Sequence, residues 1–272
     1  MEKKFKLGVI GGGFMSHAIV SGALSVGFLL PNQIIVSDVN ASSLEKFSAK
    51  GVATATDNSE ILNNAEFTLF AVKPQHFKDA VGNIGNISCE KFISIMAGVK
   101  ISSIKSALRG VNAAKVARCM PNTPCSVGNG AVGIDLTDFM GTKDAEFIKS
   151  LFSSFAKVVI TEESKLNAIT GISGSSPAYF YLFIKCLVEA GKKQGLSEED
   201  AKNLAVNTMI GSGKMIFENS DKSLDELITA VCSKGGTTIE AIKVFNDFDL
   251  SGITDKAVSA CVKRAEELEK LQ

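Results

Sequence analysis

Two glycine-containing turns, far apart in the sequence, have the residue types that bind anionic ligands. The first, Gly11-Gly12-Gly13, follows the apolar run Phe5–Ile10 and precedes a helical pattern. Its spacing fits G-x-G-x-x-G, with Ser16 in the third place instead of the usual Gly or Ala. Gly11 permits a tight turn, and Gly13 lets backbone N–H groups at the positive end of the helix dipole approach a pyrophosphate. We interpret this turn as a dinucleotide site; a plain glycine turn is the alternative.

The second turn opens a helix in the other half of the chain, and its sequence is Ser233-Lys234-Gly235-Gly236-Thr237-Thr238. Two glycines and two threonines at a helix start provide free N–H groups, a dipole end and two hydroxyls without bulky side chains. This combination suits a small carboxylate. The alternative is an ordinary helix start in which Thr237 or Thr238 is the N-cap.

An aspartate follows the second apolar strand of the sequence. Asp38 ends the run Gln33–Ser37, roughly twenty residues beyond the glycine turn, where dinucleotide folds place a ribose-binding carboxylate. Such a carboxylate accepts hydrogen bonds from the ribose hydroxyls of NAD and repels a 2′-phosphate, so it favours NADH. The alternatives are a turn aspartate before the next helix, and a site in which Ser37 and Asn40 accommodate a phosphate.

Residues suited to acid–base catalysis are scarce. The two histidines are His17, in the first expected helix, and His76. An enzyme that oxidises an alcohol needs a general base such as His or Lys near its substrate. Lys165, close to the junction of the two halves, is a candidate for this role, and a solvated helix face is the alternative reading of it.

Composition restricts the class of protein. The 272 residues allow about two domains, and the 29 basic side chains equal the 29 acidic ones, which argues against a nucleic-acid-binding or polybasic membrane surface. The six cysteines form no C-x-x-C pair, so neither zinc nor a disulfide framework is expected. The sequence shows no signal peptide and no membrane-spanning stretch, and we expect a reduced, cytoplasmic protein.

The pattern of apolar runs divides the chain into two domains. Strands alternating with helices predict an α/β fold with a doubly wound, mostly parallel sheet in a dinucleotide-binding domain at 1–161. The expected strands are 5–10, 33–38, 66–72, 92–98, 115–120, 130–134 and 157–160. Ligands of such sheets bind at the carboxyl ends of the strands. The segments Lys73-Pro74, Ala97-Gly98 and Met120-Pro121-Asn122 stand at such ends.

Residues 162–272 read as an all-helical domain. The expected helices start at Ser176, with Ser176 as cap, and then occupy 198–217, 224–231, 237–245 and 254–271. The segment Ala178–Leu187 is apolar nearly all round except for Lys185. A helix of this kind is buried on several sides. We expect it to lie in an interface between subunits.

Several stretches together resemble the pyrroline-5-carboxylate reductases, which catalyse the last step of proline biosynthesis. These stretches are Ile10-Gly11-Gly12-Gly13-Phe14-Met15, Ala71-Val72-Lys73-Pro74-Gln75, Met120-Pro121-Asn122-Thr123-Pro124, the segment from Gly171 to Tyr179, and Ser233-Lys234-Gly235-Gly236-Thr237-Thr238. They occur in the family's order and span nearly the whole chain. Four positions depart from the family pattern: Lys234 replaces a Pro, Ser176 a Gly, Ala230 a polar residue, and Cys232 a Thr or Ser.

The resemblance implies a Rossmann-type domain followed by a helical dimerisation domain, in intertwined homodimers that often form larger oligomers. It also implies that the Gly235–Thr238 loop of one subunit faces the cofactor of its partner. Beside Gly11, Gly13 and Asp38, the residues it assigns to the NADPH or NADH site are Phe14, Met15, Ser37, Asn58, Ala71, Val72, Lys73, Pro74, Ala97 and Gly98. The residues it assigns to the substrate are Ser233, Gly235, Gly236, Thr237 and Thr238.

Physical reasoning about the expected substrate agrees with this assignment. Pyrroline-5-carboxylate is a cyclic imine with one carboxylate, which N–H groups of Gly236–Thr238 would hold while the hydroxyl of Thr238, the expected catalytic residue, binds the imine nitrogen. Hydride transfer to a protonated imine mainly requires positioning and exclusion of water. Two alternatives remain: a hydroxyacid dehydrogenase using Lys165, for which the Gly-Gly-Thr-Thr loop has no evident use, and a non-catalytic dinucleotide-binding protein.

Overall fold

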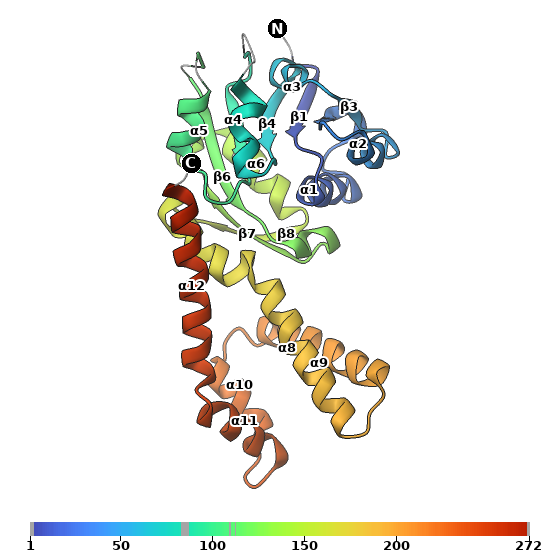
Figure 1. Ribbon diagram of the computed structural model, residues 1–272, viewed down its shortest axis with the longest axis vertical. Coiled ribbons are helices and arrows are strands. Elements are labelled where there is room, and N and C mark those ends of the chain that lie inside the picture. Colours follow the sequence, from blue (N-terminus) through green and yellow to red (C-terminus); the bar gives the residue numbers. More distant parts are fainter. Residues whose placement is uncertain (1–2, 83–86, 109, 112, 271–272) are drawn as a thin grey trace. The chain divides into compact units, whose positions relative to one another are not determined.

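The computed structural model describes residues 3–82, 87–108, 110–111 and 113–270, and the chain divides into two compact units. The first unit comprises Met1–Pro177 and Ala260–Gln272, and the second comprises Ala178–Ser259. Figure 1 labels the elements of both. Among the described residues, no helix is both long and apolar enough to cross a membrane.

The first unit contains an eight-stranded sheet in the order β3-β2-β1-β4-β5-β6-β7-β8. Its strands are β1 (Phe5–Ile10), β2 (Ile34–Ser37), β3 (Ala53–Ala55), β4 (Ala65–Phe70), β5 (Lys91–Ser94), β6 (Lys115–Met120), β7 (Gly130–Asp135) and β8 (Ala156–Ile160). Neighbouring strands are parallel except for the pair β6–β7. The order 3-2-1-4-5-6 of the first six is that of a Rossmann sheet, so the predicted fold class is confirmed.

Most helices of the first unit connect its strands, and some of them begin at side-chain caps. They are α1 (Phe14–Ser25), α2 (Ala41–Ser48), α3 (Asn58–Asn64), α4 (Phe77–Gly82), α5 (Ile101–Ala107), α6 (Lys143–Ser153) and α7 (Leu166–Ile169). The Asn40 side chain caps α2 by accepting the N–H of Ser42, and the Asp57 side chain accepts the N–H of Ser59 before α3.

The central strands of the sheet, such as β1 and β4, are buried on both faces. Successive residues of one strand belong to different hydrophobic clusters: Val9 to one and Ile10 to the other, and likewise Leu69 and Phe70. Because side chains alternate between the faces of a strand, this pattern requires a layer of packing on each side. It explains why these strands read as continuous apolar runs.

Several predicted boundaries were wrong: α12 begins at Leu250 and not at 254, and strand β3 was not predicted. Strand β5 ends at Ser94, so Ile95–Gly98 form a loop instead of the end of a strand. Ser176 is not a cap but the first residue of α8, which only Ser175 separates from a π-helical segment, Thr170–Gly174. There the N–H of Ser175 donates to the carbonyl oxygen of Thr170 over 2.8 Å, so the chain is already helical before Ser176.

The second unit is helical. Its elements are α8 (Ser176–Lys193), α9 (Glu198–Glu218), α10 (Leu224–Val231), α11 (Thr237–Asp247) and α12 (Leu250–Lys270). Helix α8 begins in the first unit, and α12 returns to it at Ala260. Ser197 caps α9, and Ser223 forms a capping box with Glu226 at the start of α10.

Many apolar side chains of the second unit are exposed in the single chain. On α8, Phe180, Tyr181 and Leu182 are 54%, 65% and 62% exposed, and Phe183 and Leu187 are also exposed. The sequence predicted a buried helix here. One copy of the chain does not bury it, and exposed apolar surface of this extent marks a surface that contacts another molecule.

Adjacent positions on α1 should respond in opposite ways to alanine. A Cβ on Gly22 would lie 2.6 Å from Cγ and 2.8 Å from Cβ of Phe155, so Gly22→Ala should lower the free energy of unfolding by about 1–3 kcal/mol. The buried hydroxyl of Ser21 has no hydrogen-bond partner among the described residues. Ser21→Ala should therefore leave stability unchanged or raise it by up to about 1 kcal/mol. Urea unfolding of both variants is the measurement, and a Gly22→Ala protein as stable as Ser21→Ala would contradict the packing.

Candidate active site

The turn after β1 brings the ends of three strands together at Gly11. This residue has a φ of +103°, and its N–H donates to the carbonyl oxygen of Ser37 at the end of β2 over 2.8 Å. On its other side the N–H of Ala71 donates to the carbonyl oxygen of Ile10 over 2.9 Å. A Cβ on Gly11 would lie 2.8 Å from the carbonyl oxygen of Ala71. Only glycine fits this position, which lies between β1 and β4, where the strand order of the sheet reverses.

Asp38 lies beside the same turn, and both of its carboxylate oxygens accept backbone N–H groups. Oδ2 accepts the N–H of Gly12 over 2.6 Å, and Oδ1 accepts that of Asn40 over 2.7 Å. The carboxylate therefore stabilises the glycine turn and the loop before α2. Its expected ribose-binding role stays a prediction.

The start of α1 fits an anionic group such as a pyrophosphate. Gly13 is the N-cap residue and, within the described ranges, no side chain caps the helix. The first turn carries no acidic residue, and a Cβ on Gly13 would meet nothing within 4 Å. Gly13 and Phe14 are exposed. Free N–H groups, a positive dipole end and open space are thus present together.

Ser16, which stands where the glycine pattern usually has Gly or Ala, has a structural role. It is fully buried, and its hydroxyl donates to the carbonyl oxygen of Gly11, which ties the first turn of α1 to the end of the glycine turn. Met15, next to it, is partly buried against the core. A glycine at position 16 would lack this bond.

Further expected cofactor residues surround the ends of β2 and β4. The buried hydroxyl of Ser37 donates to Oδ1 of Asn58 over 2.7 Å, and Nδ2 of Asn58 donates to the carbonyl oxygen of Ala80 over 3.0 Å. After β4, Ala71 and Val72 are half-buried and Lys73 and Pro74 lead into a 3₁₀ turn, with the Lys73 side chain exposed. The structure therefore brings these segments together beside the glycine turn.

Ala97 and Gly98 lie in the loop after β5. Gly98 is buried and has a φ of +70°. A Cβ on it would lie 3.0 Å from Cβ of Leu268 in α12. Gly98 therefore packs against the carboxyl-terminal helix, a contact that the sequence did not predict, whereas Ala97 is half-buried.

A buried ion-pair cluster close to this loop was also missed. Arg118 on β6 is 3% exposed, and its Nη1 lies 3.0 Å from Oε1 of Glu163 and 2.9 Å from Oε1 of Glu269. The same oxygen of Glu163 accepts the N–H of Ile101 over 2.7 Å, and Oε2 of Glu269 lies 3.7 Å from Nζ of Lys100. The available signal was an arginine in the middle of an apolar strand.

In the second unit, the loop before α11 has the geometry of an uncapped helix start. Gly235 has a φ of +72°, and Gly236 is the N-cap, its N–H donating to the carbonyl oxygen of Ser233 over 2.9 Å. No described side chain caps this helix. Thr237 and Thr238 are its first two residues, so the alternative in which either one is the N-cap is wrong. Their N–H groups are among those that an α-helix leaves without intrahelical partners.

The candidates for acid–base chemistry lie in the first unit. His17 packs edge-on against Phe47, with ring centroids 5.7 Å apart, and its burial, followed by the charges of Lys50 and Lys46, lowers its pKa. Lys165 is exposed on a 3₁₀ turn, which agrees with its reading as a solvated residue. The described residues include no group of three or more His, Cys, Asp or Glu arranged to hold a metal ion.

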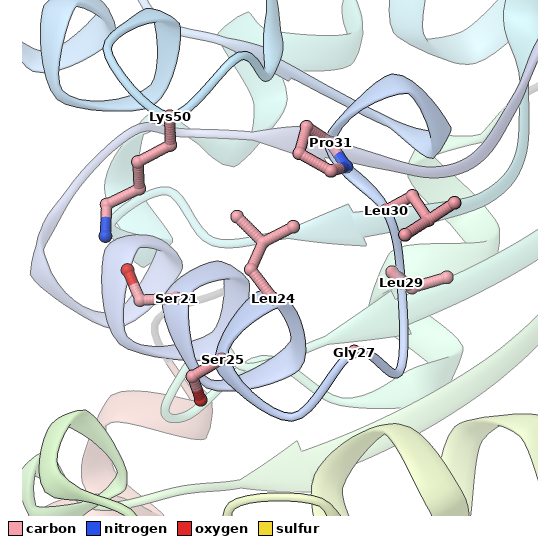
Figure 2. Close-up of a pocket in the computed structure, with 8 residues that line it drawn as sticks. All are labelled: Ser21, Leu24, Ser25, Gly27, Leu29, Leu30, Pro31 and Lys50. Carbon is pink, nitrogen blue, oxygen red and sulfur yellow. The ribbon is translucent and has the colours of Figure 1, made fainter.

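A separate hollow lies at the opposite end of α1 from the glycine turn. Figure 2 shows its lining residues, which are Ser21, Leu24 and Ser25 of α1, then Gly27, Leu29, Leu30 and Pro31, and Lys50. It contains none of the expected site residues. We therefore do not assign the cofactor or the substrate to it.

The strand order and the glycine turn together define a Rossmann-type fold of the dinucleotide-binding class. Residues 6–98 match the family described as NADP oxidoreductase, coenzyme F420-dependent, and residues 163–268 match the one described as pyrroline-5-carboxylate reductase dimerisation. The chain is 36% identical over 269 residues to the pyrroline-5-carboxylate reductase of Pasteurella multocida, covering 96% of this chain and 97% of that one. It is 35% identical over 274 residues to that of Vibrio alginolyticus, covering 100% of both.

Solved structures give the same result. A pyrroline-5-carboxylate reductase from Coxiella burnetii superposes with a TM-score of 0.88 at 34% identity, covering 98% of this chain and 99% of that one. The Plasmodium falciparum pyrroline carboxylate reductase, solved with NADP bound, superposes with a TM-score of 0.85 at 25% identity, covering 99% and 100%. The chain belongs to the pyrroline-5-carboxylate reductase family, as its motifs predicted.

Proposed function

We propose that this protein reduces L-1-pyrroline-5-carboxylate to L-proline with NADPH or NADH, the last step of proline biosynthesis. Besides membership of the family, the observation that carries the proposal is the start of α11. This helix end has no side-chain cap among the described residues and carries Thr238 as its second residue. Such an end offers a carboxylate several N–H donors and offers the imine one hydroxyl.

In this proposal the residues of the substrate loop have separate roles. Backbone N–H groups of Thr237 and Thr238 hold the substrate carboxylate, and Ser233, Gly235 and Gly236 shape the turn, because the N–H of Gly236 is already bonded to the carbonyl oxygen of Ser233. The Thr238 hydroxyl binds the imine nitrogen and orients the ring. The bound nicotinamide supplies the hydride. A protonated imine is already a strong electrophile, so this site needs to position the substrate more than it needs a general acid. The second unit contains no histidine, and this reaction does not require one there.

The cofactor occupies the turn after β1 in this proposal. The open start of α1 at Gly13 holds the pyrophosphate, and the segments at the ends of β2, β4 and β5 line the remaining part of the site. The relative from Plasmodium falciparum was solved with NADP. In the present chain, the Asp38 carboxylate places a negative charge beside the turn, which favours NADH.

The second unit completes the proposal by forming a homodimer, or a larger oligomer of dimers. Residues 163–268 match the dimerisation family, and the exposed apolar side chains of α8 are the surface that a second copy covers. The substrate loop of one subunit then faces the cofactor of its partner. The cysteines are free thiols, which supports a reducing, cytoplasmic location.

Activity assays separate this function from the two alternatives. Oxidation of NADPH or NADH in the presence of pyrroline-5-carboxylate supports the proposal. Activity with hydroxyacids in its place would indicate the dehydrogenase alternative. Cofactor binding without turnover of either substrate would indicate a non-catalytic protein.

We expect Thr238→Ala to lower kcat/KM for pyrroline-5-carboxylate by roughly ten- to a thousandfold, because one hydrogen bond to the reacting imine is lost in the transition state. Folding should change little, since Thr238 is not the N-cap of α11. Thr238→Ser keeps the hydroxyl and is the matched control. Steady-state kinetics of both variants, beside a cofactor titration, test the assignment.

Two results would contradict the role of Thr238. The first is a Thr238→Ala enzyme with wild-type kcat/KM. The second is a variant that loses cofactor affinity instead of turnover, which would place the hydroxyl in the cofactor site.

Asp38→Asn should shift the ratio of kcat/KM values toward NADPH, by roughly a factor of ten if the carboxylate repels the 2′-phosphate. Asparagine retains one acceptor oxygen for the N–H of Gly12 or Asn40, so the substitution removes the charge with less damage to the turn than alanine. Kinetics with each cofactor are the measurement. An unchanged ratio in a folded variant would mean that Asp38 stabilises the turn but does not select the cofactor.

Phe183→Glu should prevent assembly, because it puts a charge on the apolar surface of α8 that a second copy is proposed to cover. Met140→Glu is the matched control: Met140 is 69% exposed in the first unit, in the loop after β7. Sedimentation should show dimers or larger particles for the wild type and the control only. A folded, active monomer of Phe183→Glu would contradict the obligate dimer.

A further inference from the structure

The carboxyl-terminal end of α12 makes specific contacts with the loop that joins β5 to α5. Gly98 approaches it closely enough that a Cβ would lie 3.0 Å from Cβ of Leu268 and 3.4 Å from the backbone nitrogen of Glu269. This contact requires both the left-handed backbone conformation of Gly98 and its lack of a side chain. In this conformation of the loop, the end of α12 packs directly on it.

Arg118 fixes that helix end through a buried ion pair. Its guanidinium, on β6, bonds Glu269 over 2.9 Å and Glu163 over 3.0 Å. The Arg118 side chain is 4% exposed and that of Glu269 is 10% exposed. A charge this deeply buried depends on its partners, because loss of one leaves the other without compensation.

Both carboxylates that contact Arg118 also reach the residues that end the loop. Glu163 accepts the N–H of Ile101, the first residue of α5, over 2.7 Å, and Glu269 lies 3.7 Å from Nζ of Lys100. At its other end the loop is held by the sheet, where the N–H of Ile95 donates to the carbonyl oxygen of Phe70 over 3.1 Å. The sheet therefore holds the start of the loop at Ile95, and the ion-pair cluster holds its end at Lys100 and Ile101.

We propose that the end of α12 holds the Ala97–Gly98 loop in its cofactor-binding conformation and that Arg118 is the positioning residue, acting through Glu269 and Glu163. The proposal rests on the proposed function, which assigns Ala97 and Gly98 to the cofactor site. Helix α12 begins at Leu250 in the unit that contains the substrate loop and ends in the first unit. The helix that positions the cofactor loop is therefore covalently continuous with the substrate-binding unit.

Glu269→Gln tests the proposal, since it removes one charge of the cluster and keeps the side-chain size. Glu267→Gln is the matched control on the same helix, because Glu267 pairs over 2.8 Å with Arg264 and both side chains are exposed. Titration of NADPH and NADH fluorescence on the full-length protein gives the Kd for each cofactor directly. We expect Glu269→Gln to raise these Kd values by roughly five- to fiftyfold, and Glu267→Gln to leave them within twofold of the wild type.

Kinetics distinguish positioning from a general loss of stability. A positioning role raises the KM for the cofactor while the KM for pyrroline-5-carboxylate stays within twofold. A fall in kcat with an unchanged cofactor Kd would reflect only a smaller folded fraction and would overturn the proposal. A Glu269→Gln protein with the same cofactor Kd as Glu267→Gln would overturn it too.

If Glu269→Gln does not fold, Glu163→Gln provides the second measurement, since it removes the more exposed partner of Arg118. A raised cofactor Kd in that variant supports the proposal, and an unchanged one overturns it. The titration needs no turnover. It therefore decides the role of Arg118 even if the wild-type protein fails to reduce pyrroline-5-carboxylate, a result that would refute the proposed function alone.

Discussion

At the end of β1 the chain has to leave the sheet and start a helix while the backbones of two neighbouring strands remain in hydrogen-bonding contact. Gly11 meets this constraint: its N–H bonds the carbonyl oxygen of Ser37, and its missing side chain leaves room for the backbone of Ala71. Because β2 and β4 end beside it, Asp38 and Ala71 lie on either side of one turn. The candidate cofactor site depends on this convergence, since its residues come from separate segments that only the parallel sheet aligns.

The parts of this arrangement that are local in sequence were predictable. The glycine turn and the helix from Thr237 each depend on residues within one or two turns of one another, so spacing alone indicates them. The cluster around Arg118 was not predictable, because Glu163 is 45 residues away along the chain and an isolated charge in a sequence does not identify its partner. The early end of β5 has a similar origin: Ile95–Gly98 are as apolar as a strand, but Gly98 packs on α12, which sequence periodicity does not register.

The apolar side chains of α8 show a second limit of sequence reasoning. Their pattern predicts burial, yet in one copy of the chain Phe180 and Tyr181 are more than half exposed. Periodicity measures how much apolar surface has to be covered and carries no information on which molecule covers it. Residues 163–268 match a dimerisation family, which supports the proposal that a second copy covers these side chains.

The scarcity of histidine is consistent with the chemistry of an imine. Neither histidine belongs to the second unit, and His17 packs against Phe47 with a pKa lowered by burial. A carbonyl reductase has to deliver a proton to an oxygen as the hydride arrives, whereas a protonated imine carries its proton into the site. The protein then has to bind a carboxylate, orient a ring and hold a cofactor. In the proposed function, two helix ends without side-chain caps, at Gly13 and Gly236, supply anion-binding groups for the first and last of these tasks without any titratable side chain.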